Sequence, residues 1–287
     1  MPTCYLENPL SPGEHDFAII DRMHHPDVDA SWPVLELVSP MLKPQAHLYP
    51  WLLPLKEMDA RGWQTLMERL TPSQHTPPIS CLLLRSEQPV AEVRNLLIKA
   101  LYFTDRNLQG HILRYYDPRV LFHLCWMLTP YQLTQALPVP EITRWTFWLE
   151  GRWQTLAPPA EFSWQPGTPR ALPLEQLQRC GLINQVLEKL PCFSDMSRRQ
   201  QVSRKIDTLL QQAEQLQLPT DDDRAAFALR GLTLRDAFWT APKMAAFLRQ
   251  ARSSPGCFAD ETRLWDEKRW NEMTRDSSAD YERRRGK

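Results

Sequence analysis

A proline-rich segment past the middle of the chain decides how the rest can fold. Residues 157–173 read APPAEFSWQPGTPRALP, and the five prolines and one glycine of this stretch deny it a continuous helix or strand. We therefore predict a linker over 157–173. It would separate a first domain, residues 1–156, from a helical lobe over residues 174–275, and the charged residues 276–287 would form a flexible tail.

Short apolar runs alternate with helical patterns before the linker. Residues 59–70 and 90–101 place apolar side chains at three- and four-residue spacing, which indicates amphipathic helices packed on a sheet. The apolar runs suit the strands of that sheet. They cover residues 17–20, 48–55, 79–84, 112–116 and 145–149.

Capping and turn residues place two further features of the first domain. Asp117-Pro118 supplies a side-chain acceptor followed by a proline at the first helical position, which predicts a helix over about 118–128. Glu150-Gly151 lies between two aromatic-rich runs. Residues 145–149 and 152–156 are therefore predicted to form a hairpin with its turn at this dipeptide.

Strand signals disappear after the linker. Helical periodicity covers residues 174–190, 198–218, 221–231 and 242–250, and one more helix is expected after residue 260. The predicted fold class is therefore α+β. A mixed, α/β-like N-terminal lobe with a central sheet flanked by helices would be followed by an all-α C-terminal lobe.

Charge and composition exclude several classes of partner. Lysine plus arginine and aspartate plus glutamate each total 34, so no overall field attracts the chain to nucleic acid or to an anionic membrane. The six cysteines lack the paired spacing of a zinc site or a disulfide framework. The first residues have neither the basic start nor the apolar core of a signal peptide, and no apolar run is long enough to cross a bilayer. We expect a cytoplasmic protein with reduced thiols and with no nucleic-acid or membrane partner.

Candidate catalytic and metal-binding groups are weak. His24-His25 lie close to three aspartates, but adjacent histidines point apart and the spacing of a metal site is missing. Cys125 stands near His123 in an apolar stretch that predicts a buried, inert thiol. Nine glycines leave few turns for a phosphate-binding loop. The sequence therefore predicts no catalytic residue, no metal and no cofactor.

One short segment concentrates charged and aromatic residues where the predicted strand at 112–116 meets the helix at 118–128. It is the run Arg114-Tyr115-Tyr116-Asp117-Pro118-Arg119, which we call the corner. A structural interpretation pairs Asp117 with Arg114 or Arg119. The enzyme alternative is a hydrolase or transferase that uses Arg114, Asp117 and Arg119 on a small molecule, and it needs a second acid or nucleophile that no sequence motif supplies.

Eleven tryptophans are an unusually large number, and several gather near the linker. Their large amphipathic rings either fill a core or line a groove for a partner protein. Trp145, Trp148 and Trp153 are the candidates for partner binding, with a place in the core as the alternative.

The corner and its surroundings carry a resemblance to a known family. The run from His111 to Leu121, HILRYYDPRVL, resembles the signature of type VI secretion effector chaperones of the Tap/Tec type, an aromatic-rich Arg-x-Tyr-Asp-Pro-Arg-Val-Leu corner. Upstream strands and helices fall in the family's order, so the resemblance covers roughly residues 16–156. The sequence departs from the usual form in the three residues before Arg114, and this departure leaves the signature residues unchanged.

The resemblance implies a bacterial adaptor, or chaperone, without chemistry of its own. Such a protein binds a toxic type VI effector and helps to load it onto the VgrG spike protein, which delivers it into a competing bacterium. The expected partners are therefore the effector and VgrG, through protein–protein interaction. Within the family, Asp117 would cap the helix and Arg114 would tie strand to helix, and this structural role is favoured over direct contact with the partner.

Overall fold

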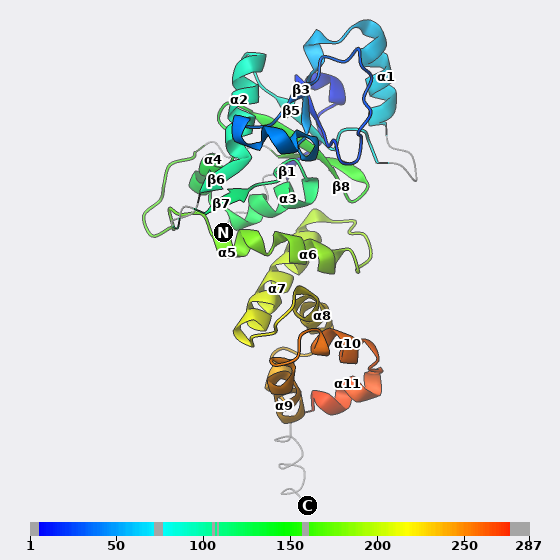
Figure 1. Cartoon of the computed structure of the whole chain (residues 1–287), viewed down its shortest axis with the longest axis vertical. Coiled ribbons are helices and arrows are strands. Elements are labelled where there is room, and N and C mark those ends of the chain that lie inside the picture. The colour runs from blue at the N-terminus through cyan, green and yellow to red at the C-terminus, as the bar shows by residue number, and fades with distance from the viewer. Residues whose placement is uncertain (1–5, 72–76, 105–106, 108, 157–160, 276–287) are drawn as a thin grey trace, which may run out of the picture. The chain divides into compact units, whose positions relative to one another are not determined.

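The chain divides into two compact units, residues Met1–Leu177 and Gln178–Lys287. The computed structural model describes residues 6–71, 77–104, 107, 109–156 and 161–275 (Figure 1). In the predicted linker, residues 161–173 form no helix or strand. Residues 157–160 and the predicted tail, 276–287, lie outside the described residues.

A seven-stranded sheet forms the centre of the first unit. Its strands lie in the order β1-β9-β8-β5-β2-β4-β3, and all neighbours are antiparallel. The strands are β1 (Leu6–Glu7), β2 (Phe17–Ile20), β3 (Leu35–Glu36), β4 (Trp51–Pro54), β5 (Leu82–Arg85), β8 (Arg144–Leu149) and β9 (Arg152–Leu156). All four residues of β2 are buried, as expected for an interior strand of a sheet that is covered on both faces.

Helical segments cover both faces of this sheet. On one face, Leu66 packs in a buried cluster with Ala18 and Leu83. Side chains alternate between the two faces along each strand, so the intervening residues point to the other face. There the ring of Trp145 in β8 meets that of Tyr115 edge-on, with 5.9 Å between the ring centres. The helices are α1 (Ala60–Leu70), α2 (Val90–Ala100), α3 (Pro118–Met127) and α4 (Pro130–Ala136), with 3₁₀ segments at Pro12–Glu14, Pro40–Leu48 and Leu55–Glu57.

The predicted hairpin is present. β8 and β9 pair in register, with Trp148 opposite Trp153, and the chain turns at Glu150-Gly151. Both turn residues have positive φ, 53° at Glu150 and 75° at Gly151, which is the conformation of a two-residue turn whose twist matches the paired strands.

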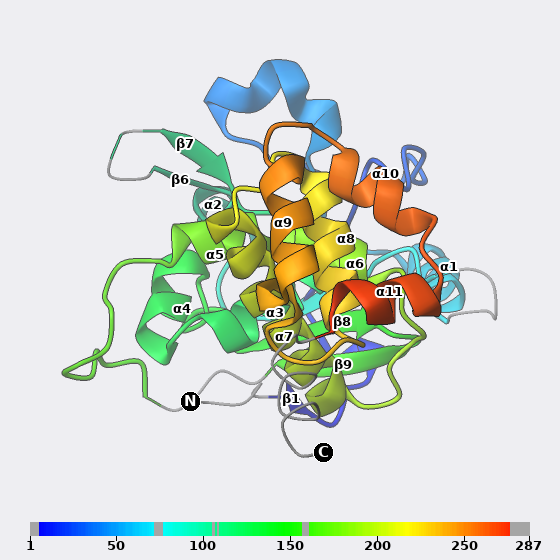
Figure 2. The same cartoon turned by 90° about the horizontal axis from the view of Figure 1, so that it is seen from below.

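The predicted strand over 112–116 is wrong. A small hairpin, β6 (Tyr102–Thr104) and β7 (Gly110–Ile112), precedes the corner and ends where the strand was expected to begin (Figure 2). In place of a strand, the chain turns over residues 114–117, where the Asp117 main-chain N–H donates to the Arg114 carbonyl at 3.0 Å. Tyr115 and Tyr116 lie inside this turn, and both are buried.

The second unit consists of helices in its described part, which confirms the α+β fold class with an all-α second lobe. They are α6 (Cys180–Leu187), α7 (Met196–Gln215), α8 (Asp221–Gly231), α9 (Pro242–Ala251), α10 (Cys257–Arg263) and α11 (Glu267–Met273), with a 3₁₀ turn at Phe238–Thr240. The single helix predicted over 174–190 is divided into α5 (Leu174–Gln178) and α6. Where one helix was predicted after residue 260, the structure has two, and the first of them, α10, already begins at Cys257.

An aromatic core holds these helices together. The ring of Phe227 in α8 lies 4.8 Å from that of Phe238 and 5.9 Å from that of Phe258, centre to centre. Phe247 of α9 joins Phe258 at 5.7 Å. Aromatic pairs at such separations add to the stability gained from area burial alone.

Candidate functional site

The corner leads into α3, and the first turn of that helix fixes its backbone. The Asp117 carboxylate accepts a hydrogen bond from the Arg119 main-chain N–H at 2.9 Å, so Asp117 caps the helix, and Pro118 occupies the first helical position. The Arg119 guanidinium donates to the same carboxylate, from Nε at 3.0 Å and from Nη2 at 2.8 Å. Asp117 thus accepts three hydrogen bonds from one residue, one from the main chain of Arg119 and two from its side chain.

The two tyrosines of the corner turn inward. Tyr115 is fully buried, and its hydroxyl donates to the Leu97 carbonyl of α2 at 3.0 Å. Tyr116 is buried beside it, and the Arg114 guanidinium lies 5.5 Å from the centre of the Tyr116 ring. Arg114 also approaches Asp21, just past β2, with 3.9 Å between Nη2 and Oδ2. The corner therefore ties α2, α3 and the end of β2 together.

A pocket of about 460 Å³ opens beside the corner, and we call it the corner pocket. Because β2, β5 and β8 are antiparallel neighbours, the end of β2, the start of β5 and the end of β8 meet at one edge of the sheet. Side chains from these strand ends and from the corner line the pocket. They are Ile19, Asp21, His24, His25, Pro77, Pro78, Ile79, Cys81, Tyr116, Asp117, Pro118, Arg119, Trp148, Leu149 and Glu150.

The aspartates of the corner pocket already have partners. His24 Nδ1 lies 3.0 Å from Asp21 Oδ2, and Asp117 holds Arg119. Burial acts to raise the pKa of Asp117, but the hydrogen bonds and charge of Arg119, helped by the charge of Arg114, outweigh burial and hold this pKa below its ordinary value. Asp117 is therefore ionised at neutral pH, with donors on its oxygens.

Burial controls two other titratable groups of the pocket. It raises the pKa of the Cys81 thiol to about 11, and the charges of Asp117 and Asp21 add to this rise. It lowers the pKa of His25, where the charge of Arg69 acts in the same direction. At neutral pH Cys81 is thus a protonated thiol and His25 a neutral imidazole.

The three candidate tryptophans occupy different places. Trp145 is fully buried and donates its Nε1–H to the Ile142 carbonyl at 3.0 Å, which places it in the core. Trp148 is half-buried and lines the corner pocket. Trp153 meets the Trp148 ring edge-on, with 5.5 Å between the ring centres. Of the three, Trp148 is the ring that faces the pocket.

The thiol and histidine of α3 are separate from the corner pocket. Cys125 is buried with its sulfur 3.2 Å from the Leu121 carbonyl, and His123 Nδ1 accepts the indole N–H of Trp126 at 3.1 Å. Among the described residues, no group of three or more histidine, cysteine, aspartate or glutamate side chains could hold a metal ion. The described helices also include none with the length and apolar character needed to span a membrane.

A family model matches the part of the chain that contains the corner. It is described as a domain of unknown function, DUF4123, and it matches residues 17–135. This family is associated with adaptors of type VI secretion effectors. The match covers less than half of the chain and lies within the first unit. No curated protein and no solved structure matches the chain.

Proposed function

We propose that the chain is a non-catalytic adaptor, or chaperone, that binds a type VI secretion effector in the bacterial cytoplasm and promotes its loading onto the VgrG spike. The observation that carries this proposal is the DUF4123 match over residues 17–135, because that family is associated with effector adaptors. The matched residues include the corner and most of the lining of the corner pocket. We refer to the bound effector as the cargo.

The corner pocket suits an apolar anchor of the cargo. Ile19, Ile79 and Trp148 line it, while Asp21 and Asp117 are engaged by neighbouring side chains. An apolar side chain of the cargo could enter the pocket without breaking these bonds. Its apolar surface would be removed from water, which favours binding. A few anchors of this kind carry most of the affinity of an interface with a total buried area of about 1,600 Å².

The proposal assigns no reaction to the corner. A carboxylic acid that donates a proton at neutral pH needs a raised pKa, whereas the pKa of Asp117 is lowered. A nucleophilic thiol needs a lowered pKa, whereas that of Cys81 is raised to about 11. These directions support a structural and binding role for the pocket.

The alternative is an enzyme that uses Arg114, Asp117 and Arg119 on a small molecule. The volume of the corner pocket, about 460 Å³, favours it because small-molecule sites have this size. Asp21 and His24 would then supply the acid and base that the sequence motifs lack. A metabolite released from the denatured wild-type chain, and lost in an Asp117→Ala variant, would favour this alternative.

Affinity purification from the bacterium that encodes the chain tests the adaptor proposal. With the secretion system expressed, the tagged wild-type chain is expected to recover a secretion effector or VgrG, identified by mass spectrometry. Trp148→Ala removes a ring from the corner pocket, and we expect recovery to fall about fivefold or more because loss of an aromatic anchor commonly costs more than 1 kcal/mol.

Trp164→Ala is the matched control for this test. Trp164 is also half-buried in the first unit, and its Nε1–H bonds to the Thr168 carbonyl away from the pocket. Recovery of neither an effector nor VgrG by the wild-type chain would contradict the proposal. An equal loss in both tryptophan variants would remove the corner pocket from it.

A further inference from the structure

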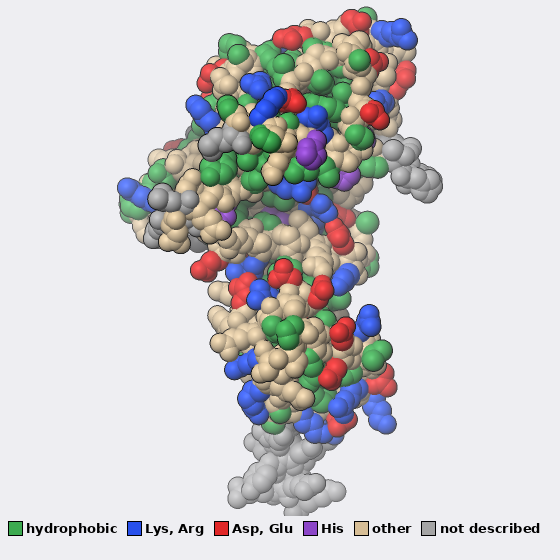
Figure 3. All heavy atoms as spheres, viewed as in Figure 1, with side chains coloured by type: hydrophobic (Ala, Val, Ile, Leu, Met, Phe, Trp, Pro, Cys, Tyr) green, Lys and Arg blue, Asp and Glu red, His purple; other side chains and the backbone are tan. Residues whose placement is uncertain are grey.

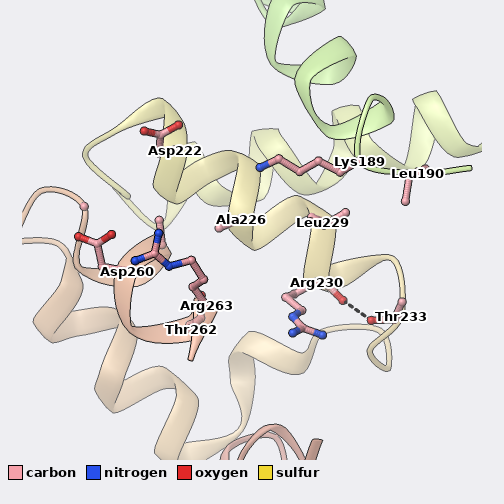
Figure 4. A pocket seen from close by; sticks show the side chains of 12 residues that line it. Lys189, Leu190, Asp222, Ala226, Leu229, Arg230, Thr233, Asp260, Thr262 and Arg263 are labelled. Carbon is pink, nitrogen blue, oxygen red and sulfur yellow. Dashed lines mark hydrogen bonds between the residues drawn. The ribbon is translucent and has the colours of Figure 1, made fainter. Parts of the chain in front are cut away.

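A second pocket lies in the second unit, and the function proposed above makes no use of it. Its volume is about 620 Å³, and its walls are α8, α10 and the residues that follow α6 (Figure 4). Asp222, Ala226 and Leu229 line it from one stripe of α8, and Ala259 and Arg263 line it from one stripe of α10. We call it the helical-lobe pocket.

Asp223 fixes the two walls to each other. This fully buried side chain of α8 accepts hydrogen bonds from the main-chain N–H groups of Gly256 and Ala259 at the start of α10, both at 2.9 Å. The Thr220 hydroxyl donates a third bond at 2.6 Å. Separating α8 from α10 would take two of its three donors away from the buried Asp223 carboxylate, so the pocket is a built feature of the unit.

Three cationic side chains from three segments surround the helical-lobe pocket. Lys189 follows α6, Arg230 lies in the last turn of α8 and Arg263 lies in the last turn of α10 (Figure 4). Within the described parts of the chain, none of the three forms an ion pair with a carboxylate. Arg230 instead stacks over the Trp270 ring, 5.0 Å from its centre, so the positive charges remain available to a partner.

The rest of the lining is apolar or acidic. Leu190, Ala226 and Leu229 provide apolar surface, and Asp222 and Asp260 bring two carboxylates from the first turns of α8 and α10. Three cations against two anions leave the pocket with one excess positive charge. Its chemistry therefore favours a ligand that combines an apolar group with negative charge.

We infer that the helical-lobe pocket docks an acidic segment of the cargo, in which carboxylates flank an apolar side chain. The apolar side chain would fill the space beside Ala226 and Leu229, and the carboxylates would meet Lys189, Arg230 and Arg263. The inference rests on the proposed function for the identity of the partner. The chemistry of the segment follows from the pocket alone.

A charge-reversal variant tests this inference. Lys189→Glu/Arg263→Glu changes two exposed side chains of the pocket, and Arg249→Glu/Lys268→Glu makes the same change in net charge on exposed residues of α9 and α11 outside it. At low salt, the purified cargo is expected to bind the pocket variant at least about tenfold more weakly than the wild-type chain and to bind the control almost normally. High salt should narrow the gap because it screens the charges.

Crosslinking identifies the docked segment. A photoreactive phenylalanine at Ala226 is expected to capture a cargo peptide that is rich in aspartate or glutamate, whereas the same group at Ala246, exposed on α9, should not. Normal cargo binding by the pocket variant, or capture of a peptide without carboxylates, would overturn the inference and leave the proposed function standing. A wild-type chain that binds no cargo would overturn both the inference and the proposed function.

Discussion

The corner pocket and the helical-lobe pocket use charge in opposite ways. In the corner pocket, Asp117 accepts three hydrogen bonds from Arg119, and His24 lies within hydrogen-bond distance of Asp21, so both carboxylates are already engaged and the apolar lining is the part that a partner can use without breaking these contacts. In the helical-lobe pocket, Lys189 and Arg263 have no carboxylate partner within the described residues. The net charge of the chain does not reveal this difference between the pockets, because the chain is neutral overall. Figure 3 likewise shows acidic and basic side chains mixed across the visible face of the second unit.

Because of this difference, the affinity of a partner for each pocket should depend differently on salt. Contact with an apolar pocket whose charges are paired depends little on ionic strength, whereas attraction to unpaired cations at a surface weakens as salt rises. Salt dependence of cargo binding therefore distinguishes the two pockets. A cargo that uses the corner pocket alone would bind with similar affinity at low and high salt.

The largest expected effect comes from removing the link between the walls of the helical-lobe pocket. Asp223→Ala leaves the N–H groups of Gly256 and Ala259 without their buried acceptor, and we expect it to destabilise the second unit by about 2 to 3 kcal/mol. Urea unfolding followed by circular dichroism measures the change. Asp222→Ala, at an exposed neighbour, is the control and should shift the transition by less than about 0.5 kcal/mol. Equal shifts would show that Asp223 does not join the helices.

A smaller, pH-dependent effect is expected at the corner. The pKa of Asp117 is lowered in the folded chain, so this carboxylate adds stability above its unfolded pKa of about 3.9 and loses that contribution as the pH falls through the folded value. Asp117→Asn keeps an acceptor oxygen but removes the charge. We expect it to cost about 1 kcal/mol at neutral pH, because Arg119 is half-exposed and its charge is partly screened.

Unfolding of the wild-type chain and of Asp117→Asn should be compared at neutral and at acidic pH. The difference in stability is expected to shrink as the pH falls below 4. A constant difference across this range would mean that the charge of Asp117 contributes nothing and that the helix cap alone matters.

Local signals in the sequence predicted the parts of the corner pocket one by one. Asp117-Pro118 indicated the start of α3, and Glu150-Gly151 indicated the turn between β8 and β9, because capping and tight turns depend on a few adjacent residues. The pocket itself could not be predicted. It exists because β2, β5 and β8 are neighbours, and strand pairing between distant segments is not written in any one of them.

The second unit shows the same limit in another form. Asp221, Asp222 and Asp223 form an acidic run at the start of α8, which in sequence is typical of exposed charges that favour the positive end of a helix dipole. The structure leaves the first two exposed and buries the third against α10. Helical periodicity predicted α8, but which of three identical residues would cap another helix depended on packing that the sequence pattern does not encode.

The smallest expected effect uses a thiol inside the corner pocket as a reporter. With a pKa of about 11, Cys81 has roughly 0.1% thiolate at pH 8, so iodoacetamide should label it far more slowly than Cys192, which is exposed in the second unit. An apolar anchor in the corner pocket would cover Cys81, and bound cargo is expected to slow its labelling severalfold further. The Lys189→Glu/Arg263→Glu variant, saturated with cargo, should show the same protection, because it changes the other pocket. If bound cargo does not change the rate of Cys81 labelling, the apolar anchor of the cargo does not enter the corner pocket. Of the two pockets, the helical-lobe pocket would then remain as the docking site.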